Sequence, residues 1–232
     1  MSFSSLSYDN FSSLISEIAK NCNEDALVIL ETTVPPGTTE KVVEPIFRSI
    51  FELRNLDFSK LKLAHSYERV MPGAKYLDSI TKSYRVFAAT NVNSSNATRE
   101  FLETFIDTKN FPLSELDCPT ASEMAKVLEN SYRAANIAFI RQWGQFAQDA
   151  GVDLYDIIEA IRVRSTHNNI MWPGFGVGGY CLSKDSLLAD WSAKNHFKNK
   201  CGLKSSVNSV KINDRMPEDT VSLIKNKVGT LK

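Results

Sequence analysis

The hydrophobic and polar positions of residues 1–118 alternate between two periods. Apolar residues at helical spacing predict a helix over 11–21, and the apolar run 26–30 predicts a short buried strand of the parallel kind. The same patterns predict a helix over 40–51 capped by Thr38 or Thr39, strands at 61–65 and 85–90, and a helix capped by Ser94 or Ser95 that ends at Phe105. Strands that alternate with helices predict a layered α/β unit.

The pattern changes near Pro119, after which the chain predicts helices almost throughout. From Ala121 to Ala150 apolar residues recur at helical intervals without a proline, which predicts one long helix that ends near Gly151. A second helix is expected over 154–163, and the polar, glycine-rich segment 164–185 is expected to be a loop. Further helices are expected around 187–198 and 205–213. We therefore place a domain boundary near residues 117–120.

Composition and charge mainly exclude classes of function. Lys and Arg number 27, as do Asp and Glu, so no basic excess argues for a nucleic-acid partner or a membrane surface. The N-terminal segment is polar and no apolar run reaches membrane-spanning length, which favours a cytoplasmic protein. The four cysteines form no C-x-x-C pair and the three histidines lack ligand spacing, so no metal is expected.

Residues 174–179 match the spacing G-x-G-x-x-G, but we do not interpret them as a dinucleotide-binding fingerprint. That fingerprint follows a strand and precedes an acidic residue by about 20 positions. Here Trp172-Pro173 comes first, and no Asp or Glu lies between Trp191 and Asn213. We interpret the segment as a loop that presents Cys181.

Cys181 is a candidate nucleophile. Lys184 follows closely, and a nearby cation favours the thiolate, which is the reactive form. Asp185 could cap the next helix and also take part in catalysis. The alternative is a plain loop with a buried cysteine.

Two features of the predicted long helix are candidates for function. Glu123, Lys126 and Asn130 share one face, where a buried lysine beside an asparagine would suit proton transfer and oxyanion stabilisation. The alternative is an ordinary Glu–Lys pair on the surface. The helix also carries an aromatic stripe, which indicates core or an oligomer interface rather than a cofactor site: Tyr132, Phe139, Trp143 and Phe146.

Polar side chains follow two of the predicted strands. Segment 31–38 comes after the first strand and offers threonine hydroxyls, and segment 65–73 comes after the next and places Glu68 beside Arg69. Ligand sites in α/β sheets lie at the carboxyl ends of strands. A carboxylate there can act as a general base and an arginine can bind phosphate. The alternatives are a Pro-Pro-Gly turn and a surface ion pair.

Together these segments resemble the UDP-glucose/GDP-mannose dehydrogenase family, also called nucleotide-sugar dehydrogenases. The resemblance lies in Glu31-Thr-Thr-Val-Pro-Pro-Gly-Thr38, His65-Ser-Tyr-Glu-Arg69 with Pro72-Gly73, Glu123-Met-Ala-Lys-Val-Leu-Glu-Asn130 and Gly178-Gly-Tyr-Cys-Leu-Ser-Lys-Asp185. It spans nearly the whole chain. Ser183 and Tyr67 stand where the family usually has proline, and we interpret both as loop adjustments.

The resemblance implies a partial Rossmann-like NAD domain followed by an all-α central domain. Residues 1–118 would be the C-terminal part of the NAD-binding domain, 119–213 the central domain for substrate binding and dimerisation, and 214–232 the lead-in to a C-terminal nucleotide-sugar-binding domain. Family members begin with a strand, a G-x-G-x-x-G loop and a helix, which this sequence lacks. We therefore expect an internal fragment that is inactive by itself.

The resemblance also implies a reaction, the oxidation of the C6 alcohol of a UDP- or GDP-sugar to a carboxylate with two NAD, as in polysaccharide biosynthesis. Cys181 would capture the aldehyde as a thiohemiacetal that becomes a thioester. Lys126 and Asn130 would stabilise the C6 oxyanion, and Asp185 would orient Lys126 or water.

Further roles follow from the same resemblance. Glu68 would assist thioester hydrolysis, with a water held by Thr33. A homodimer through the central helices would let Arg162 or Arg164 reach the partner's substrate. Cofactor contacts are expected from Glu31, Thr32, Thr33 and Lys184, and substrate contacts from Glu68, Arg69, Lys126, Asn130, Phe175, Gly176 and Gly178.

Two other functions compete with this interpretation. A relative of the β-hydroxyacid dehydrogenases would share the K-x-x-x-N helix and NAD, but it needs no G-G-x-C loop, so Cys181 argues against it. A catalytically inactive chain that only dimerises is the other alternative.

Overall fold

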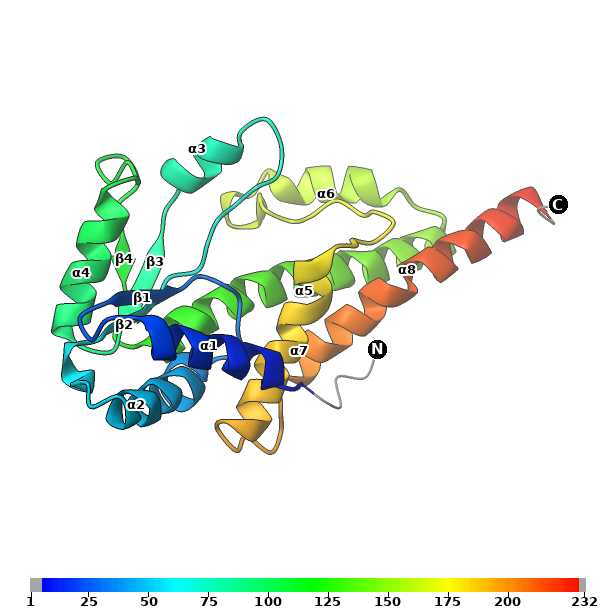
Figure 1. Cartoon of the computed structure of the whole chain (residues 1–232). Coiled ribbons are helices and arrows are strands. Elements are labelled where there is room, and N and C mark those ends of the chain that lie inside the picture. Colours follow the sequence, from blue (N-terminus) through cyan, green and yellow to red (C-terminus); the bar gives the residue numbers. More distant parts are fainter. Residues whose placement is uncertain (1–5, 230–232) are drawn as a thin grey trace. The chain divides into compact units, whose positions relative to one another are not determined.

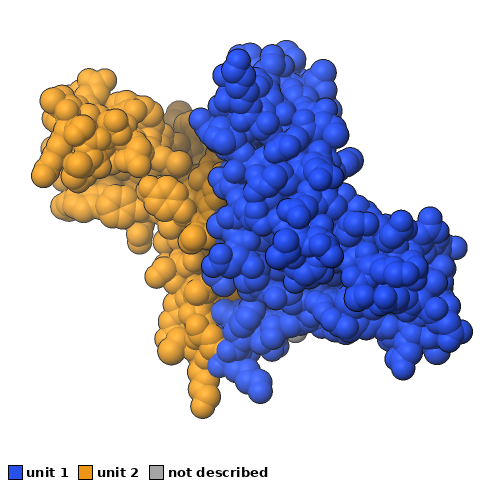
Figure 2. Space-filling view, turned by 90° about the vertical axis from the view of Figure 1, so that its left-hand side faces the viewer, with its two compact units in different colours: residues 1–127, 191–198 blue, residues 128–190, 199–232 orange. Residues whose placement is uncertain are grey.

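The computed structural model describes residues 6–229, except for the side chain of Lys227, and the chain divides into two compact units. Unit 1 runs to Val127 and includes Trp191–Lys198, and unit 2 consists of Leu128–Asp190 and the residues from Asn199 onward (Figure 2). Two helices, α5 (Pro119–Ala150) and α7 (Tyr180–Asn195), have residues in both units. The expected domain boundary after residue 118 stays a prediction, and residues 1–5 and 230–232 of the expected domains lie outside the described residues.

Within the described residues, unit 1 holds a four-stranded sheet in the order β1 (Leu27–Leu30), β2 (Lys62–His65), β3 (Val86–Ala89), β4 (Ser114–Glu115) (Figure 1). β1 and β2 pair in parallel, as predicted, β2 and β3 pair antiparallel, and β3 and β4 pair in parallel. The α/β layering is confirmed. β4 and the short helix α3 (Tyr76–Thr81) were not predicted, because neither has a buried residue and so neither shows an apolar pattern.

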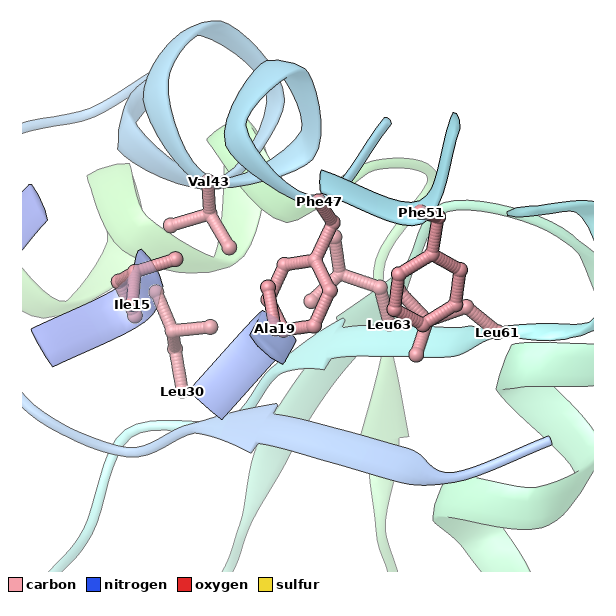
Figure 3. Close-up of a cluster of buried hydrophobic side chains, with 8 residues drawn as sticks. All are labelled: Ile15, Ala19, Leu30, Val43, Phe47, Phe51, Leu61 and Leu63. Carbon is pink, nitrogen blue, oxygen red and sulfur yellow. The ribbon is translucent and has the colours of Figure 1, made fainter. Parts of the chain in front are cut away.

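α1 (Asp9–Asn21) and α2 (Glu44–Leu53) pack together against the sheet. Their apolar residues recur three or four positions apart and so gather on one side of each helix. Burying a large aliphatic or aromatic side chain contributes about 1.5–3 kcal/mol, and this cluster is the main core of unit 1. Its buried members are Ile15, Ala19, Leu30, Val43, Phe47, Phe51, Leu61 and Leu63 (Figure 3).

α4 (Val92–Glu103) packs against β2 and β3 from the opposite face. Side chains alternate along a strand, and the antiparallel register of β2 and β3 places Leu63 and Phe87 on opposite faces. Leu63 belongs to the cluster under α1 and α2, whereas Phe87 packs against α4. The predicted serine cap is wrong, since the side chain of Asn91 caps α4 by accepting from the backbone N–H of Ser94 at 2.9 Å.

The predicted threonine cap of the second helix is also wrong. A π-helical segment, Thr39–Val43, precedes α2, and neither hydroxyl caps it. The Thr38 hydroxyl donates to a carbonyl three residues earlier at 2.5 Å, and the Thr39 hydroxyl donates to Glu123 at 2.6 Å. Glu123 itself, from α5, accepts hydrogen bonds from the first backbone N–H groups of this helical segment.

Unit 2 is helical. The long helix predicted from Ala121 to Ala150 is confirmed as α5, and Gly151, with a φ of 70°, follows it. The next predicted helix is confirmed as α6 (Leu154–Arg162), which Asp153 caps by accepting from the backbone N–H of Tyr155 at 2.8 Å. α5 and α6 share a small core of Ile140, Ala147, Leu154 and Ile158.

α7 begins inside the segment predicted to be a loop, so that prediction is wrong from Tyr180 onward. Gly179, with a φ of 92°, immediately precedes the helix. Cys181, Lys184 and Asp185 are therefore helical, and Asp185 lies in the second turn instead of capping the helix. The start was missed because glycines, which offer no side-chain oxygen for a cap, occupy the positions before it.

α8 (Lys204–Val228) extends far beyond the predicted end at Asn213. Pro217 lies inside it, and an interior proline normally ends or kinks a helix. The buried side chains of Val210 and Met216 keep this part of the helix packed within unit 2. None of the described helices is long and apolar enough to span a membrane.

Candidate functional site

The segments that follow β1 and β2 meet at one edge of the sheet. The backbone N–H of Glu68 donates to the carbonyl of Glu31 at 3.4 Å, as expected for parallel neighbours whose carboxyl ends share an edge. Thr32 is exposed and Thr33 is half-buried. The Glu31 carboxylate lies 3.3 Å from the guanidinium of Arg85.

Arg85, which was not predicted as a site residue, organises this edge. Its side chain is buried, and Nη1 donates to the carbonyl of Tyr67 at 2.8 Å. Burial lowers the pKa of the guanidinium, and the carboxylates of Glu31 and Glu68 oppose that effect. Polar residues commonly stand beside the first residue of a strand, so the position of Arg85 in the sequence does not indicate this role.

Tyr67 lies beneath two cationic side chains. The Lys126 Nζ is 5.4 Å from the centroid of the Tyr67 ring, and the Arg69 Cζ is 5.1 Å from it. The same Nζ is 3.5 Å from the carbonyl oxygen of Glu68, at the outer limit of a hydrogen bond. Tyr67 is only 2% exposed. The structure therefore brings Lys126 to the segment after β2 and makes Tyr67 part of its surroundings.

The carboxylate of Glu68 is held by its own loop. Its Oε2 accepts a hydrogen bond from the backbone N–H of Val70, and the residue is half-buried. Arg69 lines a surface hollow of about 730 Å³ together with Lys75, Lys82 and Asp78, and the Asp78 carboxylate lies 3.0 Å from the Lys82 ammonium, so the cations outnumber the carboxylate there. This is the kind of local basic cluster that an anionic ligand requires.

Glu123 is not a surface partner of Lys126, as the alternative interpretation had it. It is fully buried and accepts hydrogen bonds from the backbone N–H groups of Gly37 (2.5 Å), Thr38 (3.1 Å) and Thr39 (2.8 Å). Burial raises the pKa of Glu123 to about 7, and these donated hydrogen bonds oppose the rise. Glu123 thus joins α5 to the loop that follows β1.

His65 ends β2 as a fully buried side chain. Its Nδ1 lies 2.9 Å from the hydroxyl of Ser122 in α5. Burial lowers the pKa of His65 to about 4, so the imidazole is neutral at neutral pH.

In unit 2, a buried polar group joins α5 to α7. Asn130 Nδ2 donates to Oδ2 of Asp185 at 2.6 Å, and Asp185 is fully buried. The Lys184 ammonium lies 3.0 Å from Oδ1 of Asp185, in an ion pair whose angle does not suit a hydrogen bond. The structure therefore brings together three predicted site residues, Asn130, Lys184 and Asp185.

Cys181 is exposed in the first turn of the same helix, which rules out the buried-cysteine alternative. The Lys184 ammonium lies 4.5 Å from the centroid of the Tyr180 ring and faces Asp185, so it is engaged within α7. A helix N-terminus carries partial positive charge and favours anions.

The glycine-rich segment before α7 is fastened at its centre. Asn213 Oδ1 accepts from the backbone N–H of Val177 at 2.8 Å, and Asn213 Nδ2 donates to the Val177 carbonyl at 2.7 Å. A Cβ on Gly176, whose φ is 99°, would lie 3.0 Å from Met216, whereas Gly178 has open space around it. Phe175 is 77% exposed and lines a hollow of about 510 Å³ with Arg141 and Tyr155.

The aromatic stripe of α5 lies on the surface, so its interpretation as core is wrong for this chain. Phe139, Trp143 and Phe146 are 56%, 49% and 62% exposed, and their neighbouring ring centroids lie 6.2 and 5.9 Å apart. Arg162 is engaged in its own unit, where Nε donates to the carbonyl of Asn168 at 2.9 Å.

Both parts of the family profile described as the UDP-glucose/GDP-mannose dehydrogenase family match the chain. The NAD binding domain matches residues 5–106 and the central domain matches residues 120–215. UDP-N-acetyl-D-mannosamine dehydrogenase of Pyrococcus horikoshii is 35% identical over 213 residues, which are 90% of this chain and 47% of that protein.

Two solved structures resemble the chain closely. UDP-D-ManNAc dehydrogenase from Pyrococcus horikoshii has a TM-score of 0.77 and 30% identity, over 95% of this chain and 49% of that one. NDP-N-acetyl-D-galactosaminuronic acid dehydrogenase from Methanosarcina mazei has a TM-score of 0.81 and 26% identity, over 96% of this chain and 48% of that one. The chain spans about half the length of the curated relatives that it matches.

Proposed function

Because the chain belongs to the UDP-glucose/GDP-mannose dehydrogenase family, we propose that it carries the catalytic residues for NAD-dependent oxidation of a nucleotide-linked sugar at C6. One observation carries this proposal. Buried Asp185, held by Asn130 and Lys184, belongs to the same helix as the exposed thiol of Cys181. A buried carboxylate with polar partners near an accessible nucleophile is an arrangement that acyl chemistry uses.

We propose a UDP-linked sugar as the substrate, in preference to a GDP-linked one. The similar proteins in Pyrococcus and Methanocaldococcus are named as dehydrogenases of UDP-N-acetyl-D-mannosamine. The basic hollow beside Arg69, with Lys75 and Lys82, would suit the diphosphate of such a substrate.

Cys181 is proposed as the covalent nucleophile. Its thiolate adds to the carbonyl carbon of the C6 aldehyde, and the oxygen takes up a proton to give a thiohemiacetal. Oxidation of this adduct gives a thioester. Attack by water breaks the C–S bond, releases the thiolate and leaves a carboxylate. NAD, when bound, supplies the two oxidations, of the alcohol to the aldehyde and of the thiohemiacetal to the thioester, by accepting a hydride in each.

Lys126 and Asn130 are proposed to act on the C6 oxygen. The Lys126 ammonium can donate a proton to that oxygen or take one from it, and positive charge stabilises an oxyanion. Asn130 donates one hydrogen of its NH₂ group to Asp185, and the second hydrogen of that group can donate to the substrate oxygen. Asp185 would orient the asparagine and a water molecule.

The edge after β1 and β2 is proposed to serve the cofactor and the hydrolytic water. Thr32 and Thr33 are accessible there, and Arg85 balances the charge of Glu31, so these residues fit contacts to NAD. Lys184 is the further cofactor contact that we propose. Glu68 would take the proton of the attacking water, which Thr33 would help to hold.

We also propose that two copies of the chain associate through α5. Phe139, Trp143 and Phe146 form an exposed aromatic row, and such rows are enriched at protein interfaces. In such a dimer Arg162 or Arg164 would contact the substrate of the partner.

A single substitution tests the proposed function. In an active enzyme that contains this chain, Cys181→Ser should abolish formation of the uronic acid, measured by mass spectrometry of the sugar product. Cys201→Ser is the matched control, because Cys201 is the other exposed thiol among the described residues. Uronic acid formed by Cys181→Ser at the normal rate would refute the nucleophile.

We further propose that the 232 residues alone do not turn over substrate. Among residues 6–229 the G-x-G-x-x-G segment follows a loop and not a strand, so it does not have the setting of a dinucleotide-binding fingerprint. Fluorescence titration with NAD and size-exclusion chromatography test this. Tight NAD binding by the isolated chain would contradict an incomplete cofactor site.

A further inference from the structure

The surroundings of Tyr67, in the segment after β2, indicate a function. The residue is 2% exposed, so its ring is enclosed by protein. Its carbonyl accepts a hydrogen bond of 2.8 Å from the buried guanidinium of Arg85. The backbone and the ring of Tyr67 are therefore both held in place.

The ring of Tyr67 is placed to attract the Lys126 ammonium. The face of an aromatic ring carries negative potential, and a cation within about 6 Å of its centroid is attracted to it. The Lys126 Nζ lies 5.4 Å from the Tyr67 centroid and 3.5 Å from the Glu68 carbonyl oxygen. A lysine has a flexible four-carbon stem, and these two contacts restrict where its ammonium can lie.

Arg69 contacts the same ring. Its Cζ lies 5.1 Å from the Tyr67 centroid, so one aromatic side chain serves two cations. Arg69 lines the basic hollow and Lys126 follows the buried Glu123 by one turn of α5. Tyr67 thus links the position of a proposed anion-binding arginine to that of a proposed catalytic lysine.

We propose that Tyr67 is a positioning residue that holds the Lys126 ammonium for its action on the C6 oxygen. This inference rests on the proposed function, in which Lys126 handles that oxygen.

The contact itself is testable on the chain without any turnover. Protons above an aromatic ring resonate upfield, so the ε-CH₂ group of Lys126 should be shifted upfield in spectra of ¹³C-lysine-labelled protein. Lys126→Arg assigns the resonance. Tyr67→Phe keeps the ring face and should keep the shift, whereas Tyr67→Leu should lose it.

Two other lysines serve as internal controls. Lys184 lies 4.5 Å from the Tyr180 centroid and Lys41 lies 5.0 Å from the Phe197 centroid, so both should show ring shifts that Tyr67→Leu leaves in place. If Tyr67→Leu does not fold, the wild-type spectrum still shows whether the Lys126 side chain lies over an aromatic ring. A Lys126 resonance without an upfield shift in wild-type protein would overturn the inference.

The functional arm uses an active enzyme that contains the chain. Tyr67→Leu should lower kcat about tenfold with little change in KM, because a cation–π contact of this kind is lost. Tyr67→Phe should rescue kcat to within about twofold. Tyr76→Leu, at an exposed tyrosine of α3, is the matched control and should leave kcat unchanged.

The two proposals fail in different ways. A normal kcat in Tyr67→Leu overturns the positioning role even if the NMR shift is lost. Uronic acid formation by Cys181→Ser would instead refute the proposed chemistry, and the lysine spectrum would still decide whether Tyr67 holds Lys126.

Discussion

Replacing Glu123 with glutamine should destabilise unit 1 substantially. Each carboxylate oxygen accepts two hydrogen bonds, Oε2 from the N–H groups of Gly37 and Thr38, and Oε1 from the N–H and hydroxyl of Thr39. An amide NH₂ in place of either oxygen would face donors. The less costly orientation points it to Thr39, whose hydroxyl can turn and accept.

That orientation still leaves the backbone N–H of Thr39 without its charged acceptor. The loss of a hydrogen bond to a charged group costs about 1.5–3 kcal/mol, which is the expected loss in the free energy of unfolding of Glu123→Gln at pH 8. The cost should grow at lower pH. The folded-state pKa of about 7 exceeds the unfolded value, so wild-type protein gains stability as pH falls through 7, and glutamine cannot. At pH 5.5 this adds about 2 kcal/mol.

Urea unfolding of the wild type and of Glu123→Gln, followed by circular dichroism at pH 8 and pH 5.5, measures both quantities. Glu17→Gln is the matched control. Glu17 is exposed in α1 and pairs with exposed Lys20, one turn away, so its replacement should change stability by less than about 0.5 kcal/mol. A Glu123→Gln variant as stable as the wild type at both pH values, or a destabilisation that is smaller at pH 5.5 than at pH 8, would contradict this role of Glu123.

Three further predictions concern other residues. His65 is buried with a pKa of about 4, below its unfolded value, so wild-type stability should fall by about 3 kcal/mol relative to His65→Asn as pH drops from 7 to 4; parallel pH profiles from urea titrations would contradict this. In native protein, Cys181 and Cys201 should react with a thiol reagent at least about tenfold faster than the two half-buried cysteines, and mass spectrometry of the labelled peptides checks it. Trp143→Glu should convert a dimer of the chain to monomer in analytical ultracentrifugation, whereas Gln142→Glu, also exposed, should not; a wild-type chain that is monomeric throughout would refute the interface.

Hydrophobic periodicity was sufficient to predict the alternation of helices and strands and the full length of α5. It was insufficient for two helix starts, the one after β1 and the one after the glycine-rich segment. Thr38 and Thr39 look like caps, but the loop's N–H groups are satisfied by Glu123, more than 80 positions away in the sequence. A partner so distant leaves no local signal. The start of α7 at Tyr180 was missed for the related reason that the sequence before it contains glycines instead of a capping side chain.

The candidate site was predicted where its residues belong to a sequence motif. The pairing of Asn130 with Asp185 and the accessibility of Cys181 agree with their expected involvement, although their roles in catalysis stay predictions. Arg85 and Tyr67 were not predicted as functional, since the roles of both depend on side chains that meet only after folding. Tyr67 was noticed only as a departure from a pattern.

The carboxylate of Glu123 fixes the rotation of α5 about its own axis at this point of the helix. Glu123 is anchored on the loop after β1, and Lys126 follows it by three positions on the same helix. One residue inserted between them would turn Lys126 by about 100° around the helix axis and move it by about 1.5 Å along it. The ammonium would then leave the ring of Tyr67. Insertions and deletions should therefore be excluded from the single turn between Glu123 and Lys126.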